Sequence, residues 1–187
     1  MVNPPKIKGT KAESAFVAWL QANGFPYAER RSLSGTQDRG DVTGCPGLVF
    51  EVKDQTLWKL APWLRETAAE RENARADFGI LIIKPPGIGH VNPGNWAAVM
   101  YQGEFRRLVG DELLTHWYEE VIAPRAITKY RAIFAKQPKR ILTVIKALGV
   151  AETDLWYVSC RVSELVELLR RRGYGQVVED LPIALDI

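Results

Sequence analysis

Three charged residues lie close together in the stretch RGDVTGCPGLVFEVKDQ, which spans residues 39–55. Asp41 is followed, after nine intervening residues, by Glu51, and Lys53 comes two residues later. Two carboxylates can bind a hard divalent cation such as Mg²⁺, and a neighbouring ammonium group can position a water molecule or neutralise charge on a phosphate. The residue types therefore suit metal-assisted hydrolysis of a phosphodiester, in which the cation relieves the repulsion between the nucleophile and the phosphate oxygens.

The local pattern predicts how these three side chains are positioned. Residues 48–53 alternate in character and follow a turn at residues 44–47, so they predict a β-strand. In such a strand Glu51 and Lys53 project to one face, and the apolar residues between them project to the other. Asp41 begins a second short strand before the turn, and a hairpin of the two strands brings it close to Glu51.

The elements around this hairpin follow from hydrophobic spacing. Apolar residues at helical spacing predict a helix over residues 11–23, opened by a capping box at residues 10–13. Pro62 predicts the start of a second helix that reaches residue 76. The apolar run at residues 79–83 is typical of a strand buried on both faces. A strand, a helix and a buried strand in this order indicate a βαβ unit.

The remaining elements complete an α/β fold. They are expected as a strand at 27–31, a strand at 96–101, a helix at 111–122, a basic helical stretch ending near 148, a short apolar segment at 155–158 and a helix at 163–172. This order predicts a mixed central sheet flanked by helices, with a mostly helical C-terminal extension. Pro124 marks the predicted boundary between a core of residues 1–124 and an extension of residues 125–187.

Composition excludes several classes of protein. The 187 residues are 47% hydrophobic and 25% charged, as expected of a globular domain. Two cysteines are too few for a disulfide framework, and no apolar run reaches the roughly 20 residues that span a bilayer. A protein of the cytoplasm with no membrane partner is expected. His90, His116 and the two cysteines lack zinc-ligand spacing, and no phosphate-binding P-loop is present.

The charge is unevenly distributed along the chain. The net charge is only +3, but residues 121–151 contain no acidic residue. The same window contains several basic residues, together with Tyr130 and Phe134, a composition that suits contacts with a nucleic-acid backbone. A solvated basic helix face is the structural alternative, and it is about as common.

Taken together, these residues resemble the PD-(D/E)xK nucleases: an acidic residue in the first helix, then Asp41, then Glu51-x-Lys53 on a strand, then a helix and a buried strand. The segments that carry a closer similarity to the archaeal-type Holliday junction resolvases and their phage relatives are Lys8-Gly9 ahead of Glu13, Arg31-Ser32, Ser34-Gly35, Gly40-Asp41 and Phe50-Glu51-Val52-Lys53. The resemblance covers roughly the first 90 residues, the size of such a core unit.

The resemblance implies a restriction-endonuclease-like core and a Mg²⁺-dependent DNA endonuclease, with Mn²⁺ able to substitute. It implies a homodimer that cuts branched, four-way DNA. The implied catalytic residues are Glu13, Asp41, Glu51, Lys53 and Gln55. The implied metal ligands are Asp41, Glu51, the carbonyl of Val52 and Glu13, with one or two ions. The expected DNA-binding residues are Lys8, Lys11, Arg31, Ser34, Arg39, Lys129, Arg131, Lys139 and Arg140.

Each assignment has an alternative. Glu13 is explained equally well as part of the capping box, and Glu51 and Lys53 as a solvated strand face whose charges pair with neighbouring strands. Asp38 offers a carboxylate close to Asp41. A restriction- or repair-type nuclease on the same fold and a DNA-binding protein without catalysis are the alternative functions.

Overall fold

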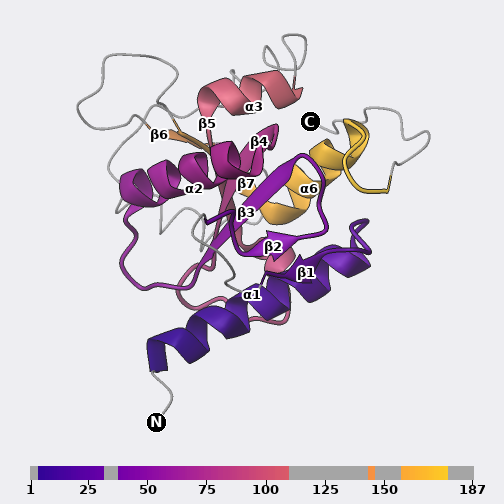
Figure 1. Cartoon of the computed structure of the whole chain (residues 1–187). Helices are drawn as coiled ribbons and strands as arrows, with labels where there is room; N and C mark the ends of the chain where they lie inside the picture. The colour runs from indigo at the N-terminus through magenta and orange to yellow at the C-terminus, as the bar shows by residue number, and fades with distance from the viewer. Residues whose placement is uncertain (1–3, 32–37, 110–142, 146–156, 177–187) are drawn as a thin grey trace.

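The computed structural model describes residues 4–31, 38–109, 143–145 and 157–176. Within them a five-stranded sheet lies between helices, so the chain has an α/β fold with a mixed sheet flanked by helices, as the sequence predicts (Figure 1). The restriction-endonuclease-like form of this core stays a prediction.

The sheet has the strand order β3-β4-β5-β7-β6. Its strands are β3 (Leu48–Lys53), β4 (Phe78–Ile83), β5 (Ala97–Tyr101), β7 (Tyr157–Arg161) and β6 (Thr143–Ile145). β3 and β4 are parallel, and every other pair is antiparallel. All six residues of β4 are buried, which explains its continuous apolar sequence. β3 lies at one edge of the sheet, so one side of its backbone has no strand partner within this sheet.

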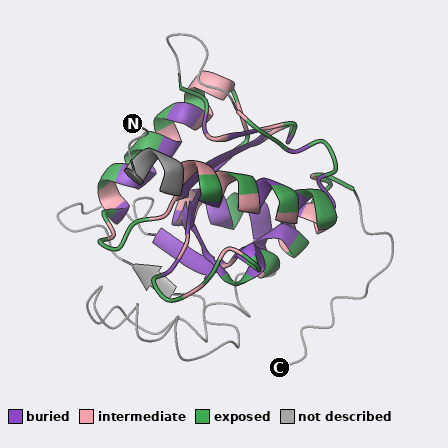
Figure 2. Cartoon of the chain, turned by 90° about the horizontal axis from the view of Figure 1, so that it is seen from below, coloured by how far each residue is buried: buried purple, intermediate pink, exposed green. Residues whose placement is uncertain are grey.

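The helices form two layers, one on each face of the sheet. Helix α2 (Leu60–Ala74) connects β3 to β4 and confirms the predicted βαβ unit. Its apolar side chains pack with Leu81 and Ile83 on one face. Helices α1 (Pro4–Ala22), α3 (Gln102–Val109) and α6 (Val162–Arg171) contribute to the core on the other face. Figure 2 shows buried residues concentrated in the strands and on the inward side of the helices.

The packing of α1 places β3 relative to the rest of the fold. Phe16 in α1 and Phe50 in β3 meet edge to face, with ring centroids 5.3 Å apart, and both are fully buried. Aromatic pairs in this geometry add about 0.5–1.5 kcal/mol to the free energy gained by burying their surface. The apolar face of β3 is therefore fixed against α1, and the opposite face is directed toward α2.

The predicted start of the first helix is wrong. Helix α1 begins at Pro4, so residues 10–13 lie inside it and form no capping box. Proline is well suited to the first turn of a helix because its missing N–H has no intrahelical partner there. Gly9 lowers helix propensity by roughly 1 kcal/mol relative to alanine, but a buried face further along the helix outweighs a penalty of this size. Glu13 therefore has no capping role.

The predicted hairpin between residues 41 and 53 is also wrong. Strand β2 (Val42–Thr43) pairs antiparallel with β1 (Glu29–Arg30) and not with β3. A tight turn, in which the Leu48 amide donates to the Cys45 carbonyl at 3.0 Å, directs the chain from β2 into β3. One backbone hydrogen bond still connects the two segments, from the Asp41 amide to the Phe50 carbonyl at 2.8 Å.

The C-terminal elements belong to the same sheet and core. The predicted helix at 163–172 is confirmed as α6, and the apolar segment at 155–158 reaches into β7, which lies between β5 and β6. Helix α3 directly follows β5 and was not predicted. The predicted helix at 111–122, most of the basic window and the boundary at residue 124 lie outside the described residues.

No helix among the described residues combines the length and the apolar character needed to cross a bilayer.

The close approach of Gly40 to β3 gives a test of this packing. A Cβ on Gly40 (φ 82°) would lie 2.7 Å from Val49 Cγ1 and 2.9 Å from the Phe50 carbonyl, whereas one on Gly87 (φ 83°) would meet nothing within 4 Å. Alanine at either position costs about 1–2 kcal/mol for the left-handed backbone. Gly40→Ala should lose a further 1–3 kcal/mol, roughly, because of the overpacking.

Urea unfolding of the two variants measures this difference. Gly87→Ala is the control for backbone strain alone, because its φ is nearly the same. Equal losses of stability in both variants would contradict the packing of the segment before β2 on β3.

Candidate active site

The charged face of β3 points toward α2, as the alternation of the strand predicts. Glu51 is buried, with 6% of its surface exposed, and Lys53 is partly buried. The Lys53 ammonium pairs with Glu51 on its own strand and with Glu66 of α2, the latter at 2.8 Å. The alternative of a solvated strand face is therefore wrong.

Asp41 lies along the open edge of β3. Its Oδ2 atom accepts a hydrogen bond from the Val52 amide at 2.7 Å, and its own amide donates to the Phe50 carbonyl at 2.8 Å. An edge strand has N–H groups without strand partners, and the Asp41 carboxylate satisfies one of them. Since the N–H and C=O of one strand residue point to the same side, the Val52 carbonyl faces this edge too.

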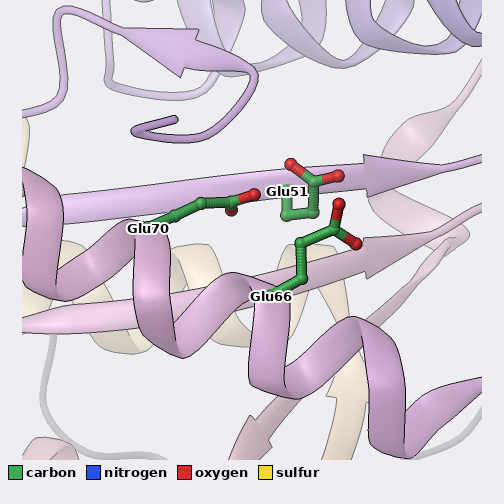
Figure 3. Close-up of side chains that lie close together, drawn as sticks. All are labelled: Glu51, Glu66 and Glu70. Atoms are coloured by element: carbon green, nitrogen blue, oxygen red, sulfur yellow. The ribbon is translucent and has the colours of Figure 1, made fainter. Parts of the chain in front are cut away.

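Helix α2 contributes two acidic residues that the sequence analysis did not single out. Glu66 and Glu70 are one helical turn apart, and Figure 3 shows their carboxylates directed toward Glu51. Each of these three residues offers an oxygen atom, and the three atoms all lie within 4.8 Å of one another. The i, i+4 spacing in the helix that follows the Glu-x-Lys strand is the signal that could have identified them.

Glu70 is the unusual member of this group. It is 1% exposed, and neither of its carboxylate oxygens has a hydrogen-bond partner within the described part of the chain. Glu104, also buried, accepts from the Gly79 amide at 2.9 Å and pairs with Arg71 at 2.9 Å. A buried carboxylate without a partner is costly unless it takes up a proton or binds a cation. Glu104 is therefore structural, and Glu70 is suited to a ligand.

The carboxyl groups of the site hold protons more tightly than usual. Burial raises the pKa of Glu70 to about 7, assisted by the charges of Asp38 and Glu66. Burial and the charge of Asp41 raise the pKa of Glu51 to about 9, against the opposing effect of Lys53. Burial likewise raises the pKa of Asp41 to about 6, although the hydrogen bond from Val52 opposes it. A bound cation would supply the positive charge that these carboxyls otherwise obtain from protons.

Lys53 remains a cation in this environment. Burial by itself would lower the pKa of Lys53, but the carboxylates of Glu51 and Glu66 outweigh it and hold the pKa above its usual range. This environment does not favour the lowered pKa that a general base would need. A fixed positive charge is suited to orienting a phosphate or to neutralising charge that develops on it.

The donor set fits a hard divalent cation. All the side chains that could bind the ion offer oxygen atoms, and Mg²⁺ and Mn²⁺ prefer such ligands. Glu51, Glu66 and Glu70 form the cluster that could hold it, and Asp41, which interacts with Glu51, could contribute together with the Val52 carbonyl at the open edge. The three clustered glutamates could bind a metal ion, and the identity of that ion stays a prediction.

The two remaining predicted catalytic residues, Glu13 and Gln55, are placed differently from one another. Glu13 of α1 pairs with Arg30, with Oε2 and the guanidinium nitrogen 3.3 Å apart, and its negative charge contributes to the raised pKa of Asp41. Gln55 lies two residues beyond the end of β3 and is exposed, so it is not on the strand face that carries Glu51 and Lys53.

The alternative carboxylate, Asp38, is placed differently from Asp41. It is exposed, and its Oδ1 atom accepts from the Gly40 amide at 3.2 Å, closing a local turn. Its charge helps to raise the pKa of Glu70, but its side chain forms no hydrogen bond with β3 in the part of the chain that the structure describes. The structure thus brings Asp41 to the strand that carries Glu51 and leaves Asp38 at the surface.

The predicted DNA-binding residues are only partly described. Lys8 and Lys11 belong to α1, where Lys11 is exposed, and Arg39 is exposed two residues before Asp41. Arg31 is partly buried and follows β1. The others lie outside the described residues, namely Ser34, Lys129, Arg131, Lys139 and Arg140.

Three comparisons with known proteins found no match to this chain. No family model matches the chain, and no significant match is found among curated proteins or among solved structures. The functional reading therefore depends on the geometry of the site and on the sequence resemblance.

The raised pKa values predict how stability depends on pH without a metal ion. Asp41, Glu51 and Glu70 bind more protons in the folded protein than in the unfolded chain, so their contribution to stability is greatest below pH 4–5, roughly, and is lost as pH rises through about 6, 7 and 9. Glu70 alone contributes at most about 3 kcal/mol to this fall. Glu70→Gln should therefore gain stability relative to wild type between pH 5 and pH 9.

Urea unfolding at pH 5, 7 and 9 in a chelating buffer measures the effect, with Glu167→Gln on α6 as an exposed control. Addition of Mg²⁺ should stabilise the wild type more at pH 9 than at pH 5, because the ion competes with protons for the same oxygens. Stability that is independent of pH in this range would contradict the crowding of ionisable carboxyls.

Proposed function

We propose that this protein is a metal-dependent endonuclease that hydrolyses phosphodiester bonds in DNA, built on the core of the PD-(D/E)xK nucleases. The observation that carries the proposal is the group formed by Asp41, Glu51 and Lys53 at one edge strand, beside a buried Glu70 that has no hydrogen-bond partner among the described residues. The PD-(D/E)xK motif requires carboxylates and an ammonium group at the same strand edge.

The carboxylates would hold the metal ion. The Asp41 carboxylate is oriented by its hydrogen bond from the Val52 amide. The side chain of Glu51, on β3, is held in place by its burial against α2. Glu70 would complete the ligand set of the same ion or bind a second ion. When bound, the ion supplies the positive charge that lets water attack a negatively charged phosphate.

Lys53 holds the phosphate. Its ammonium group lies between Glu51 and Glu66 and is kept protonated by both. A protonated lysine beside the cation attracts a non-bridging phosphate oxygen and offsets the charge that the pentavalent transition state develops. It does not accept the proton of the attacking water.

The preferred DNA structure follows from the sequence resemblance alone. A four-way junction is the proposed substrate, cut by a homodimer whose two-fold symmetry would present two sites to two strands.

A restriction- or repair-type nuclease and a DNA-binding protein without catalysis are the competing proposals. Cleavage of a panel of four-way, flapped and linear DNAs with Mg²⁺ distinguishes all three. Sedimentation of the free protein tests the dimer.

Substitution of the proposed ligands should separate Asp41 from Asp38. Asp41→Asn and Glu51→Gln should each lower the rate of Mg²⁺-dependent cleavage by at least about 100-fold, because each removes a ligand of the metal. Asp38→Asn should stay within a few-fold of wild type, since the Asp38 side chain is exposed and, within the described part of the chain, accepts a hydrogen bond only from the Gly40 amide of its own turn. DNA binding measured with Ca²⁺ should persist in all three variants.

Two results would overturn the proposal. One is a wild-type protein that cuts none of the DNA substrates with either Mg²⁺ or Mn²⁺. The other is loss of cleavage in Asp38→Asn with retention in Asp41→Asn, which would move the metal away from the edge of β3.

Metal binding gives a readout that does not depend on cleavage. Glu70→Gln should weaken binding of Mn²⁺, measured by calorimetry or electron paramagnetic resonance, by at least about tenfold. Glu72→Gln is the matched control, because Glu72 is an exposed glutamate two residues further along the same helix. Equal affinities in the two variants would exclude Glu70 from the metal site.

A further inference from the structure

A cavity of about 480 Å³ lies next to the carboxylate site. It is lined by Arg39, Glu72, Asn73, Ala74 and Arg75. Arg39 precedes Asp41 by two residues, and the other lining residues follow Glu70 toward the end of α2. The cavity volume is in the range of sites that bind small molecules or parts of larger ligands.

The two walls of the cavity are held together by a specific contact. The side-chain amide of Asn73 donates a hydrogen bond to the Asp38 carbonyl at 2.8 Å, which joins the end of α2 to the segment before β2. The same segment is fixed to β3 through Asp41. Arg39 and Arg75 are therefore presented by backbone that is anchored on both sides.

Arg75 adopts a backbone conformation that arginine disfavours. Its φ is 52° and its ψ is 40°, and it is the one non-glycine residue with positive φ among those that the structure describes. It ends α2 in the left-handed conformation, where glycine and asparagine are the usual residues. The backbone geometry alone would be better served by glycine, so the presence of arginine indicates a use for its side chain.

The charges around the cavity favour an anion. Two guanidinium groups line it, against the one carboxylate of Glu72, and Arg71 lies 3.6 Å from that carboxylate. Guanidinium groups recognise phosphate through two parallel N–H donors, and phosphate is the anion that the proposed substrate carries at every nucleotide. Neither Arg39 nor Arg75 has a salt bridge among the described residues.

We propose that this cavity is a phosphate-binding subsite for the DNA strand, in which Arg39 and Arg75 hold a backbone phosphate beside the one at the metal. The proposal rests on the nuclease function proposed above. It adds the residues that would fix the position of the DNA strand relative to the metal site. A phosphate contact of this kind fixes position and orientation without reading sequence. The subsite would receive either an internal phosphate or a terminal 5′-phosphate, which share the same chemistry.

The conformation of Arg75 permits a test in which loss of binding cannot be attributed to loss of folding. Arg75→Gly removes the guanidinium group and relieves the left-handed backbone, so its thermal unfolding midpoint should equal or exceed that of wild type. Its affinity for a four-way DNA junction, measured by fluorescence anisotropy with Ca²⁺, should fall roughly tenfold. The slope of log affinity against log salt should become smaller by about 0.9 for a duplex contact.

Matched variants and substrates sharpen the result. Arg106→Ala on α3 is the control for removal of an exposed arginine elsewhere, and it should leave affinity unchanged. Arg39→Gln should weaken binding as Arg75→Gly does. Oligonucleotides with and without a 5′-phosphate distinguish the two sources of phosphate: an effect confined to the phosphorylated strand assigns the subsite to a terminal phosphate, and an equal effect assigns it to an internal one.

The outcomes separate the subsite from the nuclease. If the wild-type protein cuts DNA and Arg75→Gly binds DNA with unchanged affinity and salt slope, the proposed phosphate subsite is wrong. The proposed nuclease function is then unaffected. If wild type neither binds nor cuts DNA, both are wrong. If Arg75→Gly unfolds at a lower temperature, Arg39→Gln decides: weaker binding at an unchanged midpoint supports the subsite, and unchanged binding overturns it.

Discussion

The hydrogen bond from the Val52 amide to the Asp41 carboxylate is the interaction on which the site depends. β3 is an edge strand, so its outward N–H and C=O groups must find partners other than a strand. Asp41 satisfies the amide of Val52 and leaves the carbonyl of the same residue at the open edge. One interaction thus protects an exposed strand edge and places a carboxylate next to Glu51. A sheet with another strand at this position would have no room for the site.

The buried carboxyls of the chain divide into two kinds by their partners. Glu104 accepts from a strand amide and pairs with an arginine, which compensates for the loss of water and ties α3 to β4 and α2. Glu70 is equally buried but has no such partner among the described residues. Burial alone therefore does not distinguish the two acids, whereas burial without compensation makes Glu70 the candidate for a bound cation. The same argument explains why Lys53, with two carboxylate partners, stays charged and serves as a fixed cation.

Local patterns in the sequence predicted the parts of the structure that depend on local geometry. The alternation in residues 48–53 gave the correct face for Glu51 and Lys53, and the apolar run at 79–83 gave the buried strand of the βαβ unit. The hairpin was wrong because it depends on which distant strand pairs with β2, and the start of α1 was wrong because the buried face further along the helix outweighs the local signal at residues 10–13. Glu66 and Glu70 were missed because a helix shows its own spacing in the sequence but not the strand that it covers.

Helix α2 connects the proposed metal site to the proposed phosphate subsite. One stretch of the helix carries Glu66 and Glu70 against β3, and its end carries Asn73 and Arg75 against the segment that leads into Asp41. Uncompensated burial of Glu70 and the left-handed backbone of Arg75 both lower the stability of the free protein. Two unfavourable features on one helix are unexpected in a purely structural element. Glutamine in place of Glu70 and glycine in place of Arg75 would remove them. A cation at Glu70 and a phosphate at Arg75 would offset both, so the helix is best explained as an element whose unfavourable groups are completed by a polyanionic substrate and its metal ion.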